Sequence, residues 1–362
     1  MSNRFAVIMA GGRGERFWPQ SRHAKPKHLL PIVGDKPLLA QTIARLQPLI
    51  ALENILVITN RHQEAAVREV AAMLPAANII AEPVGRDTAA ATGLAAVLVA
   101  ARTPDAAFAM LPADHVIHDA AEYRTNLEAA FVVAEREDSL VTLGIRPTEP
   151  ASGFGYIQRG EPVEPALGRA VHVLTRFVEK PTRAVAIKYL ESGDYFWNAG
   201  MFVWRAPVVT AAFAEHAPTV WEGLGEVAAG LARGEALDGL LERLYPAIPK
   251  ISVDYAIMEK ARNCRVLPAS FDWDDVGSWP AITRHFGSDD AGNVVLGSGL
   301  VEQGAGNLVV STGDHLVTVL GTEDLIVVHT PDATLVCPKA RAEEIKALLK
   351  RVEANPELRG LL

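Results

Sequence analysis

Close to the N-terminus, a short apolar run leads directly into a basic, glycine-rich loop: Phe5-Ala6-Val7-Ile8-Met9-Ala10-Gly11-Gly12-Arg13-Gly14-Glu15-Arg16. The apolar run predicts a buried strand at residues 5–10. Glycines that follow a strand let backbone N–H groups approach phosphate oxygens, because they have no Cβ to block the approach. Basic residues in and after the loop would add positive charge. The stretch therefore predicts a polyphosphate site built from Gly11, Gly12, Arg13, Gly14, Arg16 and Lys27.

This loop differs from both of the common phosphate-binding fingerprints. A Walker loop has Gly-Lys followed by Ser or Thr, whereas the lysines here, Lys25 and Lys27, lie beyond Pro19. A dinucleotide-binding loop has a third glycine where this chain has Phe17. The structural alternative is a tight glycine turn that is merely basic.

Outward from the loop, the first 145 residues alternate between short apolar runs and helical patterns. Such alternation is typical of an α/β fold with a Rossmann-like, mostly parallel sheet and helices on both faces. Ligands in these folds bind beyond the carboxyl ends of the strands, where the glycine loop would lie. The predicted strands are 5–10, 54–59, 78–81, 106–111 and 140–145. The predicted helices are 37–49, capped by Asp35, and 64–74, 88–101 and 122–135.

Beyond residue 150 the pattern becomes mixed and then rich in short β runs. The predicted strands in the middle are 171–178 and 196–204, and the predicted helices are 182–191, 207–216, 219–244 and 253–261. Short β runs at 307–311, 316–320, 325–329 and 334–337 recur at a spacing of about nine residues, which suits a small β module. An amphipathic helix is predicted at 339–353. We place the boundary near 287–292, giving a catalytic domain at 1–288 and the β module with its helix at 289–362.

Composition limits the classes of function. The 362 residues are 49% hydrophobic and 22% charged, which describes a soluble globular protein with ample core. The net charge of -8 argues against a nucleic-acid partner, which would need a basic face. Cys264 and Cys337 lie far apart, so neither a disulfide framework nor a zinc site is expected, and a reducing cytoplasm fits. No apolar stretch approaches the roughly 20 residues of a membrane span.

Carboxylates with the pattern of metal ligands occur at two places. Asp114 follows the predicted strand 106–111, where a side chain would point into the ligand crevice. Asp275 belongs to the acidic segment Asp272-Trp273-Asp274-Asp275. Mg²⁺ in nucleotide sites takes one or two carboxylates together with phosphate and water oxygens, so Asp114 and Asp275 would suffice if they converge. Each aspartate could instead be an ordinary cap or turn residue.

Three further segments carry polar groups suited to a sugar or a base. Glu179 and Lys180 end a predicted strand and could meet sugar hydroxyls and a second phosphate, or form a surface ion pair. Asn198 lies within an apolar strand and must be hydrogen-bonded by a ligand or by the backbone. Gly155 could let a ring lie against the backbone, or could mark a hairpin bulge. The segment with Glu82, Pro83, Asp87 and Thr88 could bind a base edge, although Asp87 or Thr88 could equally cap a helix.

The histidines lack a metal-ligand spacing, and no Ser-His-Asp order stands out, so we expect a site without a protein nucleophile. Together the motifs resemble the sugar-1-phosphate nucleotidyltransferases, and most closely their mannose-1-phosphate guanylyltransferase branch. The likeness extends over nearly the whole chain in consistent order. The matching segments are 11–22, 26–31, 82–83, 111–115, 153–157, 177–181, 197–201 and 273–279.

The resemblance implies a role for each segment. The glycine loop would hold the phosphates of GTP, with Arg16 and Lys27 on the α-phosphate and the leaving pyrophosphate. Asp114 and Asp275 would hold Mg²⁺. Lys180 would contact the sugar phosphate. The mannose ring would contact Gly155, Glu179 and Asn198, and guanine would bind at residues 82–88. The C-terminal module would be a small left-handed β-helix, and a homodimer is expected only from this likeness.

The sequence departs from the family pattern at a few positions. Family members often have Asn and then Pro where this chain has Asp87 and Ala90, which bears on base binding, and Tyr where Phe154 stands. Longer bacterial relatives append a cupin-like phosphomannose isomerase domain. The chain stops at Leu362 without room for that domain, so we expect no isomerase activity.

The reaction implied is GTP with α-D-mannose 1-phosphate giving GDP-mannose and pyrophosphate. One alternative is the same chemistry with another nucleotide and hexose 1-phosphate. A second is a non-catalytic subunit that senses nucleotide sugars, which the joint presence of Arg16, Lys27, Asp114, Lys180 and Asp275 disfavours. A third is an NAD-dependent dehydrogenase, which Phe17 and the lysines of the loop disfavour.

Overall fold

The structure is a computed structural model that describes residues 3–362. Its centre is a nine-stranded sheet in the order β3-β2-β1-β4-β8-β5-β9-β7-β6. Strands β7 and β8 run opposite to the other strands of this sheet, so the expected mostly parallel α/β sheet is confirmed. The strands are β1 (Arg4–Met9), β2 (Ile55–Asn60), β3 (Ile79–Glu82), β4 (Ala107–Pro112), β5 (Leu140–Ile145), β6 (Gly155–Ala166), β7 (Arg169–Val178), β8 (Tyr195–Arg205) and β9 (Cys264–Pro268).

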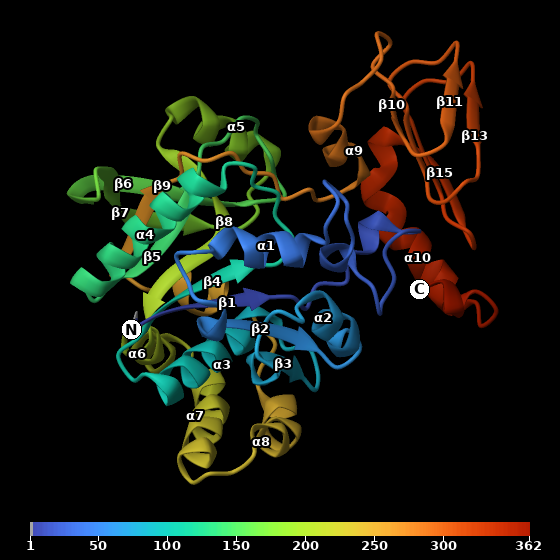
Figure 1. Ribbon diagram of the computed structural model, residues 1–362. Helices are drawn as coiled ribbons and strands as arrows, with labels where there is room; N and C mark the ends of the chain where they lie inside the picture. Colours follow the sequence, from blue (N-terminus) through green and yellow to red (C-terminus); the bar gives the residue numbers. More distant parts are fainter. Residues whose placement is uncertain (1–2) are drawn as a thin grey trace.

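Helices cover both faces of the sheet, as Figure 1 shows. Neighbouring strand residues point to opposite faces, so Val7 packs into one hydrophobic core and Ile8 into the other. On the Val7 side lie α3 (Asp87–Arg102), α6 (Ala206–His216), α7 (Pro218–Ala232) and α8 (Leu237–Leu244). On the Ile8 side lie α1 (Leu38–Leu46), α2 (Glu64–Val70) and α4 (Ala120–Arg136), and α5 (Arg183–Ser192) packs beside β8.

Several local predictions were wrong. The predicted helix 219–244 is interrupted near Gly234, whose φ of +81° is a conformation open to glycine but costly for other residues. Asp35 does not cap α1, which begins after Pro37. The predicted helix at 253–261 is a short π-helical segment, Asp254–Met258. Strands β6 and β9 were not predicted.

The C-terminal module is a small β-helix, as predicted. Strands β10 (Val294–Leu296), β12 (Leu308–Ser311) and β14 (Leu325–His329) stack in parallel, and β15 (Thr334–Pro338) pairs antiparallel with β14. A second parallel pair, β11 (Gly299–Glu302) and β13 (Val317–Leu320), forms another wall. At a corner, Asn293 and Asn307 hydrogen-bond to each other and to the backbone of neighbouring coils. This ladder satisfies the buried polar groups where the chain turns.

The module packs directly against the N-terminal loop region. Phe17, Trp18 and Leu38 share one hydrophobic core with Val310 of β12 and with α10 (Ile345–Ala354). The indole of Trp18 donates a hydrogen bond of 2.9 Å to the carbonyl of Leu361. In Figure 1, α10 lies between the β-helix and the N-terminal loops. We propose that the division at 1–288 and 289–362 separates two parts that share this core.

Among the short elements of the described chain are α9 (Trp279–Ile282) and a 3-10 turn (Lys339–Glu344) that leads into α10. The turn occupies the start of the single helix predicted at 339–353. Across residues 3–362, no helix combines the length and the apolarity that crossing a membrane requires.

Candidate active site

The glycine loop packs tightly against the segment that carries Lys27. Gly14 has a φ of +62°, and a Cβ there would lie 2.6 Å from both the backbone nitrogen and the Cβ of Lys27. Any other residue would therefore force the loop and the 3-10 turn Lys27–Leu29 apart. Around Gly12 the space is open and the residue is exposed. The loop thus presents its backbone to solvent on one side and fixes Lys27 on the other.

Lys27 links the two predicted metal ligands. Its buried ammonium lies 2.8 Å from Oδ2 of Asp114 and donates to the carbonyl of Asp275 at 2.6 Å. Burial by itself would raise the pKa of Asp114, but the charges of Lys27 and His115 outweigh it and lower this pKa to about 2. Asp114 is therefore ionised throughout the neutral range, directly beside a buried cation.

Backbone contacts bring the two aspartates together. Val116 and Asp274 exchange N–H···O=C hydrogen bonds of 2.9 and 3.0 Å in an isolated antiparallel bridge. The carboxylate of Asp272 accepts the N–H groups of His118 and Asp119 at 2.8 and 2.7 Å. The segment after β4 and the acidic segment are consequently held side by side.

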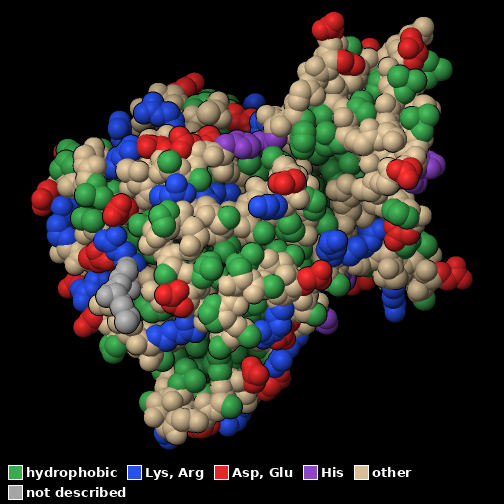
Figure 2. All heavy atoms as spheres, viewed as in Figure 1, with side chains coloured by type: hydrophobic (Ala, Val, Ile, Leu, Met, Phe, Trp, Pro, Cys, Tyr) green, Lys and Arg blue, Asp and Glu red, His purple; other side chains and the backbone are tan. Residues whose placement is uncertain are grey.

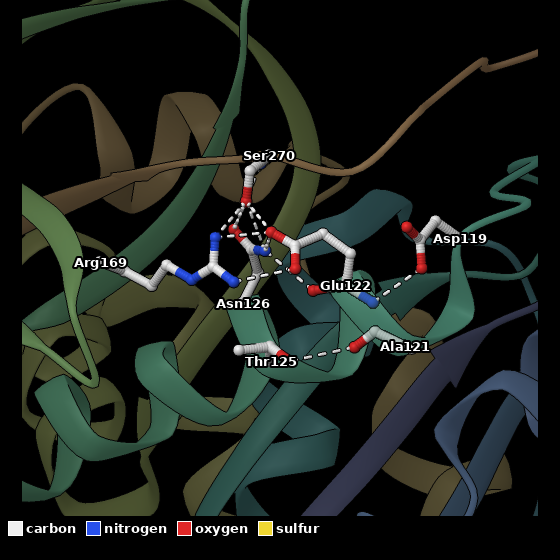
Figure 3. A network of polar contacts seen from close by, with 7 residues as sticks. All are labelled: Asp119, Ala121, Glu122, Thr125, Asn126, Arg169 and Ser270. Carbon is white, nitrogen blue, oxygen red and sulfur yellow. Dashed lines mark hydrogen bonds and ion pairs between the residues drawn. The ribbon is translucent and has the colours of Figure 1, made fainter.

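A polar network around the start of α4 anchors the chain just before the acidic segment (Figure 3). Arg169 donates to Glu122 at 2.8 Å and to the hydroxyl of Ser270 at 2.9 Å. Asn126 donates to the same hydroxyl at 2.9 Å, and Asp119 caps the helix by accepting the N–H of Glu122. The network holds residue 270, two positions before Asp272, against α4.

Neighbouring carboxylates in the acidic segment differ sharply. Asp274 accepts from Arg284 at 2.7 Å through both oxygens, from His285 at 2.9 Å and from the N–H of Val276 at 2.8 Å. The carboxylate of Asp275, by contrast, has no hydrogen bond or ion pair with any residue between 3 and 362. Gly277 makes room for it, since a Cβ at position 277 would lie 2.7 Å from its Oδ2.

The environment of Asp275 suits a cation. Burial raises the pKa of its carboxyl, Lys27 opposes the shift, and the nearby charges of Asp274 and Asp114 raise the pKa further. A divalent cation beside it would relieve that repulsion. The described residues contain no cluster of three or more His, Cys, Asp or Glu side chains arranged to hold a metal. Two carboxylates with phosphate and water oxygens nevertheless match the ligand set that Mg²⁺ takes in nucleotide sites, so the residues fit the ion.

These groups open onto one cavity of about 320 Å³. Figure 2 shows Lys and Arg side chains at the junction between the main body and the C-terminal module. Arg16 is paired across that junction with Glu343, at 2.7 Å. The cavity brings together predicted and unpredicted residues: Arg13, Gly14, Glu15, Arg16, Phe17, Lys27, Asp114, His115, Asp275, Gly277 and Lys346.

The predicted sugar-binding residues form a second group, the sugar-binding group, which consists of Gly155, Glu179, Lys180 and Asn198. Oε1 of Glu179 pairs with Lys180 at 2.9 Å, and its Oε2 lies where a Cβ on Gly155 would approach to 2.5 Å. Asn198 faces Gly155 across the β6–β8 pair and donates to Asp254 at 2.9 Å. Burial and the charge of Glu179 raise the pKa of Asp254 to about 6. Asp254 was missed, because it comes from the π-helical segment and has no motif of its own.

The predicted base-binding segment follows β3, next to the glycine loop. Glu82 is buried, accepts a hydrogen bond from Tyr245, and has its Oε2 3.6 Å from where a Cβ on Gly11 would lie. Burial raises the pKa of Glu82 to about 7. The Thr88 hydroxyl accepts the N–H of Val253 at 2.9 Å. Pro83 lies in the bend between β3 and α3, and Asp87 begins α3 with a φ of +64° and accepts the N–H of the next residue at 2.8 Å.

Comparison with known proteins gives the family. A model of the nucleotidyl transferase family matches residues 5–292, which is most of the chain. The chain belongs to the nucleotidyl transferase family. A second model, of the MannoseP isomerase/GMP-like beta-helix domain, matches residues 301–352. The resemblance found in the sequence is confirmed, and this chain is a transferase enzyme.

Individual relatives of this nucleotidyltransferase are similar over nearly its whole length. A mannose-1-phosphate guanylyltransferase of Escherichia coli is 36% identical over 96% of the chain and 74% of that protein. One from Sinorhizobium fredii is 40% identical over 96% of the chain and 68% of that protein. A solved structure described as a mannose-1-phosphate geranyltransferase from Thermus thermophilus is 38% identical, with a TM-score of 0.84, over 97% of this chain and 99% of that chain.

Proposed function

We propose that this nucleotidyltransferase transfers GMP from GTP to α-D-mannose 1-phosphate, producing GDP-mannose and pyrophosphate. The observation that carries the proposal is the cavity in which Arg16 and Lys27 lie beside Asp114 and Asp275. Cations and a metal-binding carboxylate pair around one space suit the α-phosphate of a nucleoside triphosphate. The names of the two relatives that are 36% and 40% identical supply the choice of guanine and mannose.

Asp114 and Asp275 are the residues that would hold Mg²⁺. When bound there, the ion would neutralise negative charge that develops on the α-phosphate and on the departing pyrophosphate. Lys27 contacts the carboxylate of Asp114 and the backbone carbonyl of Asp275, so it would hold the two segments that carry these aspartates together. The glycine loop would hold the β- and γ-phosphates through its backbone N–H groups.

The reaction would proceed as a single displacement at the α-phosphorus. A phosphate oxygen of the sugar phosphate attacks the α-phosphorus, forming a P–O bond, while the bond from that phosphorus to the oxygen bridging to the β-phosphate breaks. Pyrophosphate leaves with that electron pair. The attacking oxygen is already anionic near neutral pH, so no strong base is needed. Arg16 and Lys27 would stabilise charge on the α-phosphate and the leaving group, as in other phosphoryl-transfer sites.

Positioning provides the rest of the rate acceleration. Two polyanions repel each other in water, and holding them in line for the reaction can lower the activation free energy by about 7–11 kcal/mol. Lys180 would receive the sugar phosphate, because its side chain is 63% exposed and its ammonium lies beside Glu179. Glu179 would accept hydrogen bonds from the mannose hydroxyls, and Asn198 would donate hydrogen bonds to them. The mannose ring would lie over Gly155.

The base would lie along residues 82–88. Glu82 sits under the glycine loop, so a base bound beside it would place its phosphates over that loop. A carboxylate that accepts two guanine N–H groups would favour GTP over ATP. Pro83, Asp87 and Thr88 would form the wall of this part of the site.

A substrate matrix tests the proposal. The protein is incubated with Mg²⁺, with each of GTP, ATP, UTP and dTTP, and with either mannose 1-phosphate or glucose 1-phosphate, and released pyrophosphate is measured. We expect the fastest release with GTP and mannose 1-phosphate, with GDP-mannose as the second product. A higher kcat/KM for another pair would overturn the assigned substrates, and no pyrophosphate from any pair would overturn the proposed activity.

A further inference from the structure

The cavity contains one cation that the sequence motifs do not include. Lys346 lies on α10, in the C-terminal module, and lines the cavity together with residues of the glycine loop. On either side of it along the helix, Ile345 and Leu349 are buried in the core shared with Phe17. The helix is therefore fixed by packing, which places the backbone of Lys346 beside the cavity.

Charge balance makes this lysine important. Arg13, Arg16 and Lys27 each have an acidic partner: Glu15 at 3.6 Å, Glu343 at 2.7 Å and Asp114 at 2.8 Å, respectively. Within residues 3–362, Lys346 has no ion pair. The lining cations other than Lys346 are matched in number by the lining acids Glu15, Asp114 and Asp275. Lys346 gives the cavity its excess positive charge.

We propose that Lys346 is a polyphosphate-binding residue, through which the C-terminal module completes the nucleotide site. It would bind the β- or γ-phosphate of the triphosphate, on the side away from the sugar-binding group. This inference rests on the proposed function for the identity of the nucleotide. The ligand chemistry itself, a chain of phosphates, follows from the cavity.

The ion pair between Arg16 and Glu343 supports the same arrangement. It joins the glycine loop to the 3-10 turn that leads into α10, only three residues before Lys346. The ion pair thus adds a contact between the module that carries Lys346 and the loop that would hold the phosphates. A shift of the module would move both Lys346 and the partner of Arg16.

Lys346→Gln tests the proposal, with Lys350→Gln as a matched control. Lys350 is exposed, lies one turn further along α10, and does not line the cavity. Loss of one charge-assisted phosphate contact should raise KM for GTP about tenfold, with kcat changed less than about twofold and KM for mannose 1-phosphate unchanged. Lys346→Arg should restore most of the affinity, and melting temperatures should agree among all the variants.

Calorimetric titration with inorganic tripolyphosphate and Mg²⁺ provides a readout that does not require turnover. We expect Lys346→Gln to weaken this binding about tenfold and Lys350→Gln to leave it unchanged. Equal affinities in the two variants would refute the role of Lys346, even if the wild-type protein makes GDP-mannose. Weakened binding in a protein that releases no pyrophosphate would support Lys346 and refute only the proposed reaction.

Discussion

Lys27 in the phosphate cavity and Lys180 in the sugar-binding group lie in opposite environments. Lys27 is buried and held between two backbone segments, with 7% of its side chain exposed. Lys180 is 63% exposed, and Glu179 is its one ion-pair partner among residues 3–362. A buried, fixed cation can stabilise charge as it develops without reorganising, whereas an exposed one mainly attracts and orients a ligand. Changes at Lys27 should therefore affect kcat, and changes at Lys180 should affect KM for the sugar phosphate.

Two neighbouring carboxylates in the acidic segment also differ, in this case in how many hydrogen-bond partners they have. Asp274 has all of its hydrogen-bonding capacity used by Arg284, His285 and Val276. Asp275 is next to it and faces the cavity, with Gly277 leaving space around it. A bonded carboxylate serves the fold, and one that is left without partners is available to a ligand.

Asp275→Asn should have the largest effect. The amide keeps the shape of the side chain but removes the charge that would hold Mg²⁺ against the α-phosphate. We expect kcat to fall about 10²- to 10³-fold, with the melting temperature unchanged or slightly raised, because a partly buried charge has been removed. Pyrophosphate release at saturating Mg²⁺ and thermal unfolding measure the two quantities.

Asp274→Asn is the matched control for that experiment. It breaks the paired contacts with Arg284 and His285, so it should lower the free energy of unfolding by about 1–3 kcal/mol. Any loss of activity should accompany the loss of folded protein. If Asp275→Asn kept a near-normal rate, or if Asp274→Asn matched it in kcat with full stability, the distinction between the two aspartates would be wrong.

Gly155→Ala should have an intermediate effect, confined to the sugar phosphate. The new Cβ would lie 2.5 Å from Oε2 of Glu179 and 3.3 Å from Cβ of Asn198, so both side chains must move. We expect KM for mannose 1-phosphate to rise about tenfold and KM for GTP to stay the same. Gly153→Ala is the control, because a Cβ added there would meet no atom within 4 Å. Equal kinetics for the two variants would remove Gly155 and Glu179 from the sugar site.

The residues that sequence reasoning brought together share a local signal. Gly14 and Arg16 stand in one contiguous loop, and Asp114 follows a run with the pattern of a buried strand. A strand followed by polar residues places them at a known edge of the sheet, whatever the remaining fold is. The general position of the phosphate cavity could therefore be predicted.

Other parts depended on contacts that a single sequence does not contain. Lys346 reaches the cavity only because the β-helix docks on Phe17 and Trp18, and Tyr245 reaches Glu82 from the far end of α8. Strand β6 was missed because its second half is largely exposed and polar, unlike a buried run. These features result from tertiary packing, which overrides local propensity.

Asp254→Asn should have the smallest effect, and its sign depends on pH. The pKa of Asp254 is raised from 3.8 to about 6, so the folded protein binds this proton more tightly than the unfolded chain does. The protonated carboxyl therefore favours the fold more than the ionised one does. Its contribution to the free energy of unfolding is lost as pH rises from about 4 to above 6. The amide at position 254 still accepts from Asn198 and cannot ionise beside Glu179. We expect the variant to gain about 1 kcal/mol over the wild type at pH 8 and little at pH 4.5, measured by urea unfolding at both values. A gain of the same size at both pH values would mean that ionisation of Asp254 does not cause the effect. Asp114 in the phosphate cavity, whose pKa is about 2, remains ionised across the same pH range, so the two sites would then not differ in the way that their carboxyl pKa values indicate.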